Sequence, residues 1–389
     1  MMKKRNGALC FWAFIFCMIF VLHYAYFFDP KSLSKGAFFF YRGELAIDLI
    51  FIVIGALLAK TVSEIPFDRP FTWREYGSFL KSKLRIYLPA FVICWIATFI
   101  LINKVYTTDI SAVWNNLLTS LLELLPFRNA GFNPSGVDDL TIVGYRVMDQ
   151  AWVISAAFIA LALLYPLYRR NRKRFEYYIA PVGAVLLLCF LFFKTKQLSG
   201  DNLLLLDAKP KALFYSFVGT YKALGEILAG VTCFTLARRF SEKPVSKAKS
   251  HLLSVLEIGC YLGAICYMQF MLRFELPEIF DFLAIALMIL GVFLSLSGKS
   301  SVSRLFDNKV CRFLGRFSLY PLLTFMMFAK TLRFFFPDMG NRMLTLIYLA
   351  LTLLSAIIVM LLEKPLVKLI KSMKKLFVKE QPRPNKETA

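Results

Sequence analysis

The sequence contains only two histidines, His23 and His251, and its 25 acidic residues are outnumbered by 47 basic ones. His23 is the single histidine in its apolar run, which argues against the multi-imidazole sites that hold zinc in many enzymes. Eight cysteines are present, but they fall in the apolar runs or at a cytoplasmic edge, none lies in an outer loop, and none has the spacing of a metal site. The sequence therefore predicts neither a metal nor a disulfide framework.

Apolar residues, by contrast, are abundant. They make up 58% of the chain and give a mean hydropathy of +0.60, against about 45–50% apolar residues in soluble domains. They fall in runs near the length of about 20 residues that crosses a bilayer as a helix. Because helices satisfy their own backbone hydrogen bonds in lipid, we predict an all-α polytopic membrane protein, a bundle of about ten transmembrane helices. The predicted spans are 8–28, 44–60, 85–103, 151–168, 177–194, 212–237, 253–272, 278–297, 314–334 and 342–363.

The chain shows no repeat and no soluble second domain. We therefore expect one ten-helix membrane domain over residues 1–363, followed by a basic cytoplasmic tail over 364–389. Between the third and fourth spans, residues 104–150 contain an amphipathic stretch around Ser111–Leu125. Such a stretch can lie along the membrane surface, where it would act as a lid over a cavity.

Lysine and arginine gather on alternate connections of the predicted bundle. Clusters such as Lys3-Lys4-Arg5, the run at 169–174 and the tail fall on one side, and this predicts both termini in the cytoplasm of a cell membrane. The first apolar run is too long for a signal peptide and no cleavage site follows it, so we expect it to be retained. The net charge of +22 is spread over membrane-flanking loops, which favours anionic membrane lipids over nucleic acid as its partner.

His23 lies inside the first span, where an ionisable side chain is costly and usually functional. At about 1.5 Å per residue it is about 22 Å into the membrane, and Asp48 of the second span lies about 6 Å below the outer boundary. The two side chains are thus predicted at similar depth, and Glu44 and Asp48 are four residues apart on one face. A His23–Asp48 pair would form a general base. A purely structural clasp between two helices is the equal alternative.

Other polar residues have simpler explanations. Lys222 and Glu226, four apart in the sixth span, are expected to neutralise each other within one helix. Trp152 and Ser155 open the fourth span at the outer face, where they are candidates, with Glu44, for substrate binding. The plain alternative for Trp152 is an interfacial anchor.

Lys81, Lys83 and Arg85 stand where the third span enters from the cytoplasm. They are candidates for binding the phosphates of a cytosolic donor. Ordinary positive flanking of a membrane helix is the plain alternative.

Several stretches together resemble the membrane acyltransferase 3 family. The first span, KRNGALCFWAFIFCMIFVLHY, places His23 where the family has a histidine, and GELAIDLIFIVIGALLAK resembles its second-helix signature with Asp48 and Gly55. FLKSKLRIYLPAF, AWVISAAFIALALLYPLY and FLGRFSLYPLLTF resemble later family segments in the same order. The resemblance covers residues from about 4 to 360 and includes ten spans.

Three positions depart from the family pattern. Trp12 stands where the family usually has an arginine, eleven residues before the histidine, and Ile54 replaces a serine. No histidine follows Tyr320, although many relatives have one. The missing arginine leaves open a divergent substrate or a lost transferase activity.

The resemblance implies an enzyme that moves an acyl group, commonly acetyl, from acyl-CoA to a sugar hydroxyl. The acceptor would be an extracytoplasmic carbohydrate or lipid-linked glycan, as in bacterial cell-envelope polysaccharide modification. His23 would deprotonate the hydroxyl or briefly carry the acyl group, with Asp48 orienting it, and acyl-CoA would be the donor without a metal. A proton-coupled transporter or flippase, and a catalytically silent scaffold, stay open as alternatives. The sequence indicates no oligomeric state.

Overall fold

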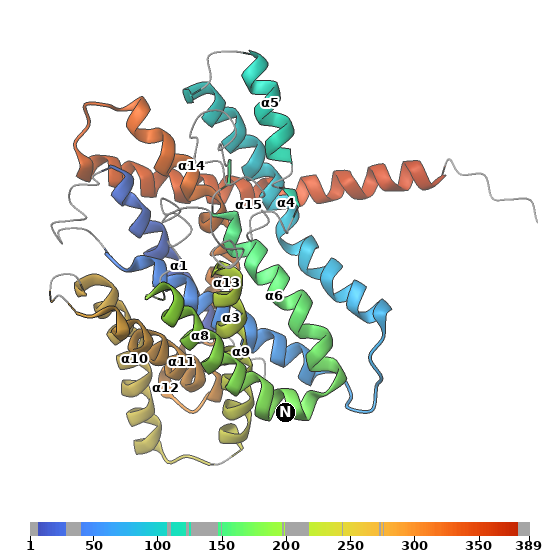
Figure 1. Ribbon diagram of the computed structural model, residues 1–389, viewed down its shortest axis with the longest axis vertical. Coiled ribbons are helices and arrows are strands. Elements are labelled where there is room, and N and C mark those ends of the chain that lie inside the picture. Colours follow the sequence, from blue (N-terminus) through green and yellow to red (C-terminus); the bar gives the residue numbers. More distant parts are fainter. Residues whose placement is uncertain are drawn as a thin grey trace, which may run out of the picture.

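The computed structural model describes residues 7–28, 40–106, 110–121, 124–125, 147–148, 150–196, 198, 218–242, 244–271, 274 and 276–379. Every regular element within these ranges is a helix (Figure 1). The longer ones are α1 (Gly7–His23), α3 (Ala46–Ser63), α4 (Trp73–Tyr106), α5 (Ile110–Leu121), α6 (Ala151–Arg170), α8 (Ala180–Thr195), α9 (Val218–Ser241), α10 (Lys247–Phe270), α11 (Asp281–Ser297), α13 (Lys309–Phe317), α14 (Leu319–Phe335) and α15 (Asn341–Lys379). Shorter elements are η1 (Tyr24–Phe28), η2 (Gly43–Leu45), α7 (Arg172–Arg174), η5 (Phe175–Ile179), η9 (Glu278–Phe280) and α12 (Ser301–Leu305).

Each predicted span overlaps a helix, so the all-α bundle is confirmed. Seven segments of the described chain are long and apolar enough to cross a membrane: Gly43–Ser63, Trp73–Val105, Ala151–Arg170, Arg172–Thr195, Lys247–Phe270, Glu278–Ser297 and Asn341–Lys368. The chain is therefore a multi-pass membrane protein. Helix α1 is apolar but shorter, and α14 has 17 residues.

Helix α9 is long enough to span a membrane but is not among the seven. It carries Lys222 and Glu226 and packs against α3, α6, α8 and α11. A helix surrounded by other helices faces protein rather than lipid, so it can hold charged groups that a lipid-facing helix cannot. This central position makes α9 the helix against which the polar interior is built.

Helices α3 and α9 approach each other closely because each presents a glycine to the other's backbone. A Cβ atom on Gly55 would meet the carbonyl oxygen of Ile227, and one on Gly230 would meet that of Ile52. Small residues allow this approach in membrane bundles, where packing rather than water exclusion holds helices together. The contact fixes which face of α3 is turned toward α9.

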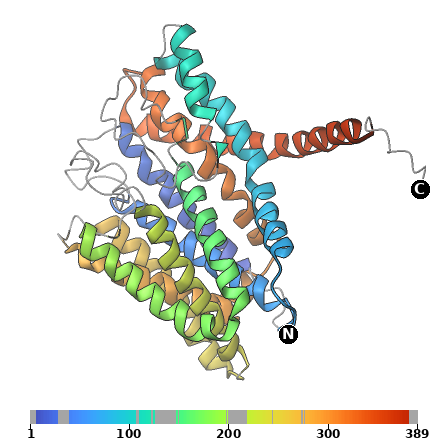
Figure 2. The same ribbon diagram turned by 45° about the vertical axis from the view of Figure 1, so that its right-hand side comes forward.

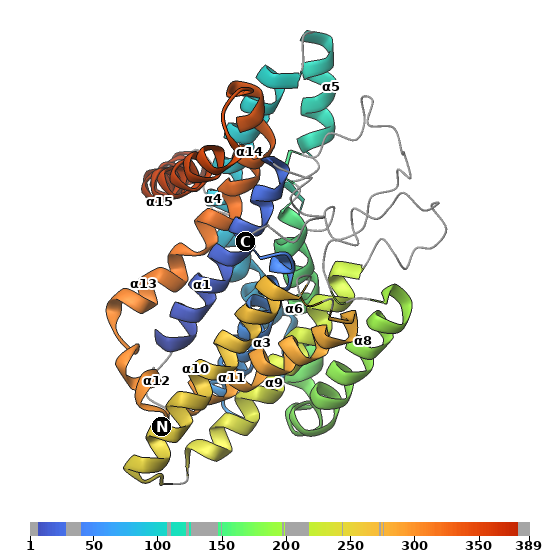
Figure 3. The same cartoon turned by 90° about the vertical axis from the view of Figure 1, so that its left-hand side faces the viewer.

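The basic connections lie at one end of the bundle. Figures 1 and 3 show the start of α1, the α3–α4 connection, the turn after α6 and the α9–α10 connection at the same end. Helix α5 lies toward the opposite end beside the last turns of α4, where Trp95 Nε1 donates to the Ser120 carbonyl at 3.1 Å. The loop beyond it, from 126 to 146, is outside the described residues, and the lid remains a prediction.

Helix α15 runs without interruption from Asn341 through Lys379. Its C-terminal part projects beyond the other helices (Figures 1 and 2). The predicted division between a membrane domain ending at 363 and a tail from 364 therefore falls inside a continuous helix. That division remains a prediction.

Replacing Gly55 or Gly230 by alanine is expected to lower the free energy of unfolding by about 1–3 kcal/mol, because the added methyl meets a backbone atom. Gly259→Ala on α10 is the matched control, since a Cβ there meets nothing within 4 Å, and it should be neutral or slightly stabilising. Thermal unfolding of the purified protein compares the three variants. Equal midpoints would contradict the close α3–α9 packing.

Candidate functional site

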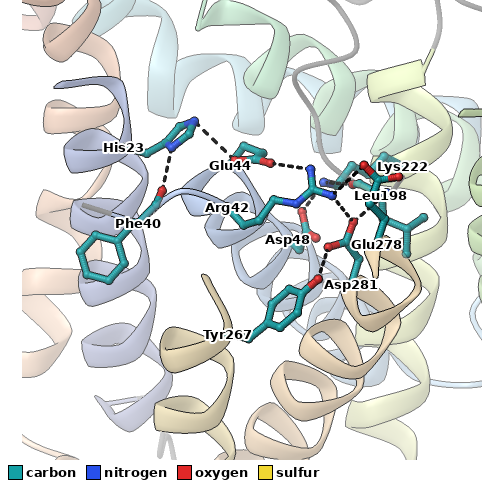
Figure 4. A network of polar contacts seen from close by, with 10 residues as sticks. All are labelled: His23, Phe40, Arg42, Glu44, Asp48, Leu198, Lys222, Tyr267, Glu278 and Asp281. Carbon is teal, nitrogen blue, oxygen red and sulfur yellow. Dashed lines mark hydrogen bonds and ion pairs between the residues drawn. The ribbon is translucent and has the colours of Figure 1, made fainter. Parts of the chain in front are cut away.

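His23 is the last residue of α1 and is only 3% exposed. Its Nδ1 lies 2.8 Å from the carbonyl oxygen of Phe40, three residues before the start of η2 (Figure 4). Gly43 allows this segment to lie close to α1, because a Cβ atom at residue 43 would collide with the Cβ of His23. A carbonyl oxygen can only accept, so this contact requires the proton on Nδ1.

The other ring nitrogen faces a carboxylate. Nε2 of His23 lies 3.4 Å from Oε2 of Glu44, and both side chains are almost completely buried. With Nδ1 protonated, a neutral ring presents the Nε2 lone pair to a negative oxygen, and the two repel unless a proton lies between them. This side of the ring is therefore the place where a proton can be exchanged with a ligand.

Glu44 is in turn held by Arg42, which precedes it by two residues. The Arg42 guanidinium lies 3.3 Å from Glu44, 3.4 Å from Asp281 and 3.7 Å from Glu278. Burial by itself would lower the pKa of Arg42, but the carboxylates of Glu44 and Asp281 outweigh it and raise that pKa. Arg42 thus stays charged and ties the η2 turn to the start of α11.

Asp281 binds two further parts of the chain. Its side chain is fully buried, accepts a hydrogen bond of 2.7 Å from the Tyr267 hydroxyl and another of 3.1 Å from the backbone N–H of Leu198. The Leu198 carbonyl oxygen accepts from Lys222 Nζ at 2.6 Å. The backbone of Leu198 therefore links Asp281, through its N–H, to Lys222 of α9, through its carbonyl oxygen (Figure 4).

The predicted pairing of Asp48 with His23 is wrong. Asp48 lies 2.6 Å from Lys222 Nζ, and both side chains are completely buried. Gly55, seven residues further along α3, contacts α9 as well, so this face of α3 is turned toward α9.

Glu44 and Asp48 were predicted on one helix face, but they lie in successive helical elements and have different partners. Glu44 lies in the η2 turn, a 3₁₀ helix, and α3 begins only at Ala46. The acid beside the imidazole is Glu44, whose Oε2 lies 3.4 Å from Nε2 of His23.

Lys222 and Glu226 were expected to pair within α9. Lys222 instead forms its ion pair with Asp48 of α3. Glu226 is fully buried one turn along α9, and neither of its carboxylate oxygens accepts a hydrogen bond from a described residue. The centre thus holds two acids and one cation. Its charge balances if the acids share one proton.

Trp152 and Ser155 lie in the first turns of α6 and are buried. Trp152 packs against the Phe51 ring at a centroid distance of 6.1 Å and covers the backbone at Gly219. Trp152 is therefore a contact between α6, α3 and α9 and is only 7% exposed, unlike an interfacial anchor. Substrate binding by these two residues remains a prediction.

Lys81, Lys83 and Arg85 lie in the first half of α4. Lys81 and Arg85 are exposed, whereas Lys83 is half-buried with its ammonium 5.1 Å from the centroid of Phe79. Helix α4 supplies none of the residues drawn in the His23 network of Figure 4. Donor binding by the three basic residues remains a prediction.

Trp12 occupies a packed position on α1. Its ring stacks on Tyr261 at 4.3 Å, and the side chain is 7% exposed. The nearby Glu257 carboxylate on α10 accepts hydrogen bonds from the hydroxyls of Ser295, Ser300 and Ser303. At the position of the family arginine, this chain therefore has an aromatic stack, and the acid close by is satisfied by serines.

Arg42, Tyr267 and Asp281 were not singled out from the sequence. Arg42 and Asp281 had a usable signal, since Arg42 comes two residues before a predicted span and Asp281 lies inside one, where ionisable groups are functional candidates. Tyr267 had none, because a tyrosine in an apolar run is usually a packing residue.

Apolar helices around a buried cluster of charged groups define a multi-pass membrane protein with an internal polar site. A family model described as an acyltransferase domain matches residues 12–363. The chain therefore belongs to the acyltransferase 3 family, as the motifs indicated. No curated protein and no solved structure matches the chain.

Lys222→Met is expected to destabilise the fold by about 3–5 kcal/mol, because it leaves a buried carboxylate without its cation. Adding Asp48→Asn removes that charge and should restore most of the loss. Thermal unfolding of the two single variants and the double variant gives the coupling. Strictly additive losses would contradict a direct Lys222–Asp48 pair.

Proposed function

We propose that this protein is an integral-membrane O-acyltransferase that uses His23 as its general base. Membership of the family supports acyl transfer in general. The observation that carries the assignment of the base is the orientation of the His23 ring, with Nδ1 on the Phe40 carbonyl and Nε2 toward Glu44. The fixed ring leaves one nitrogen to exchange a proton, which general-base catalysis requires.

In the proposed reaction, Nε2 of His23 takes the proton from an acceptor hydroxyl. The hydroxyl oxygen attacks the thioester carbonyl carbon of an acyl-CoA and forms a tetrahedral intermediate. When the carbon–sulfur bond breaks, the CoA thiolate leaves and recovers the proton from His23, giving an ester and free CoA. Glu44, beside the same nitrogen, would stabilise the positive charge on the ring during this exchange. The Phe40 carbonyl on Nδ1 would fix the tautomer, which is the role first given to Asp48.

For the substrates, we propose acetyl-CoA as donor and a sugar hydroxyl of an extracytoplasmic polysaccharide or glycolipid precursor as acceptor. Lys81, Lys83 and Arg85 would hold the donor phosphates from the cytoplasmic side, since cations on α4 suit a phosphate ligand. His23, at the far end of α1 from its basic start, suits an acceptor that arrives from outside. Both termini would then lie in the cytoplasm of the cell membrane.

A proton-coupled transporter is the second candidate. The observation in its favour is the completely buried group formed by Asp48, Lys222 and Glu226 between α3 and α9. Ionisable groups inside membrane bundles often mark proton pathways. In the acyltransferase, we assign this group a structural role, because Lys222 neutralises Asp48 directly.

Replacing His23 by alanine is expected to lower acetyl transfer by about 10²–10⁴-fold, the usual contribution of a general base. Glu44→Gln should also lower the rate, whereas the double variant Lys222→Met/Asp48→Asn should retain transfer, because it removes the pair that does not touch the ring. Purified proteins of normal abundance are assayed with radiolabelled acetyl-CoA and candidate glycans.

Two results of this assay would contradict the proposal. Full activity of the His23→Ala protein would remove His23 from the mechanism. Proton-linked solute flux in liposomes, without label on any glycan, would support the transporter instead.

A further inference from the structure

A corner at the basic end of the bundle combines exposed aromatic rings with exposed cations. It is formed by the α3–α4 connection and the turn after α6, and we call it the basic–aromatic corner. Its exposed members are Phe67, Arg69, Trp73, Arg170 and Lys173, and the partly buried Phe71 and Arg172 lie beside them. None of them belongs to the His23 network.

The corner is held in one shape by buried ion pairs. Arg169 makes a forked contact with Glu75, with distances of 2.7 and 3.3 Å, and the Tyr165 hydroxyl donates to the same carboxylate at 2.6 Å. Arg169 also donates to the backbone carbonyl of Arg69 at 3.2 Å. Bidentate pairs of this kind are geometrically specific, so the connection is fixed against the end of α6.

These pairs engage Glu75 and Glu176, whereas Glu64 and Asp68 of the α3–α4 connection are exposed acids outside them. Glu75 is taken by Arg169, and Glu176 is shared by Arg172 and Arg238 at 3.0 and 3.3 Å. Arg69, Arg170 and Lys173 are exposed, and no described carboxylate forms an ion pair with them. Arg74 and Arg174 are exposed as well, so the exposed cations outnumber Glu64 and Asp68 and the corner presents a net positive charge in a fixed geometry.

The aromatic rings lie directly beside these cations. Phe67 is 63% exposed and Trp73 is 66% exposed. The Arg170 guanidinium lies 5.6 Å from the Trp73 ring, and the Lys173 ammonium lies 5.6 Å from the Phe67 ring. Large apolar side chains that stay exposed beside several cations form an amphipathic surface, as at a membrane interface.

We propose that the basic–aromatic corner binds the headgroup of an anionic phospholipid. The phosphate would lie between Arg170 and Lys173, and the rings of Phe67 and Trp73 would lie among the glycerol and upper acyl groups of the same leaflet. A soluble phosphate ligand would leave the Phe67 ring in water, whereas a lipid covers the ring and pairs with the charge together. The proposal does not depend on acyl transfer.

The test uses the full chain in nanodiscs of phosphatidylcholine, with and without phosphatidylglycerol. Native mass spectrometry counts the retained phosphatidylglycerol, and thermal unfolding measures its stabilising effect. The variant is Arg170→Gln/Lys173→Gln. The matched control is Lys247→Gln/Lys249→Gln, two exposed lysines at the start of α10 near the same end of the bundle.

Phosphatidylglycerol affinity is expected to fall about five-fold for each cation removed from the corner, the equivalent of about 1 kcal/mol per residue. Retention by the control variant should match the unchanged protein. Equal loss of phosphatidylglycerol in both variants would mean that the overall positive charge, and not this site, attracts the lipid, and would overturn the proposal. Stabilisation by CoA or inorganic phosphate in pure phosphatidylcholine, lost in the corner variant, would make it a soluble-phosphate site and would also overturn the proposal.

Discussion

A charged group inside a membrane bundle needs a partner, and this constraint organises the interior of the protein. The starting point is the Lys222–Asp48 pair, which joins α9 to α3 with both side chains fully buried. Lys222 also holds the Leu198 backbone, whose N–H is bound by Asp281. Breaking a buried pair costs far more than forming it gains, so such pairs specify one arrangement of the helices.

The two acids near the start of α3 have different roles as a result. Asp48 belongs to the central pair and holds helices together. Glu44 lies beside the imidazole and is held from its other side by Arg42. The sequence left two explanations for a single His23–Asp48 pair, a structural clasp and a general base. The structure has two separate contacts instead: Asp48 pairs with Lys222, and Glu44 lies beside His23.

The sequence was sufficient to predict the helices and the burial of His23 inside the bundle, but not which charged groups pair with one another. Apolar runs of membrane length identify helices because the bilayer fixes their length and internal hydrogen bonding. The partner of His23 was misassigned because hydropathy does not reveal that Lys222 of α9 pairs with Asp48, while Glu44 lies beside the imidazole. The Arg42–Asp281 contact joins residues 239 positions apart, and only the packing of α3, α9 and α11 brings them together.

The most direct test of the account is the protonation of the His23 ring. Because the chain has only two histidines, a His251→Asn protein with isotopically labelled histidine gives the nitrogen NMR signals of His23 alone. The account predicts a proton on Nδ1, and an Nε2 signal that changes with Glu44→Gln but not with Lys222→Met/Asp48→Asn. A bare Nδ1, or an Nε2 signal that responds to Asp48 and not to Glu44, would contradict it.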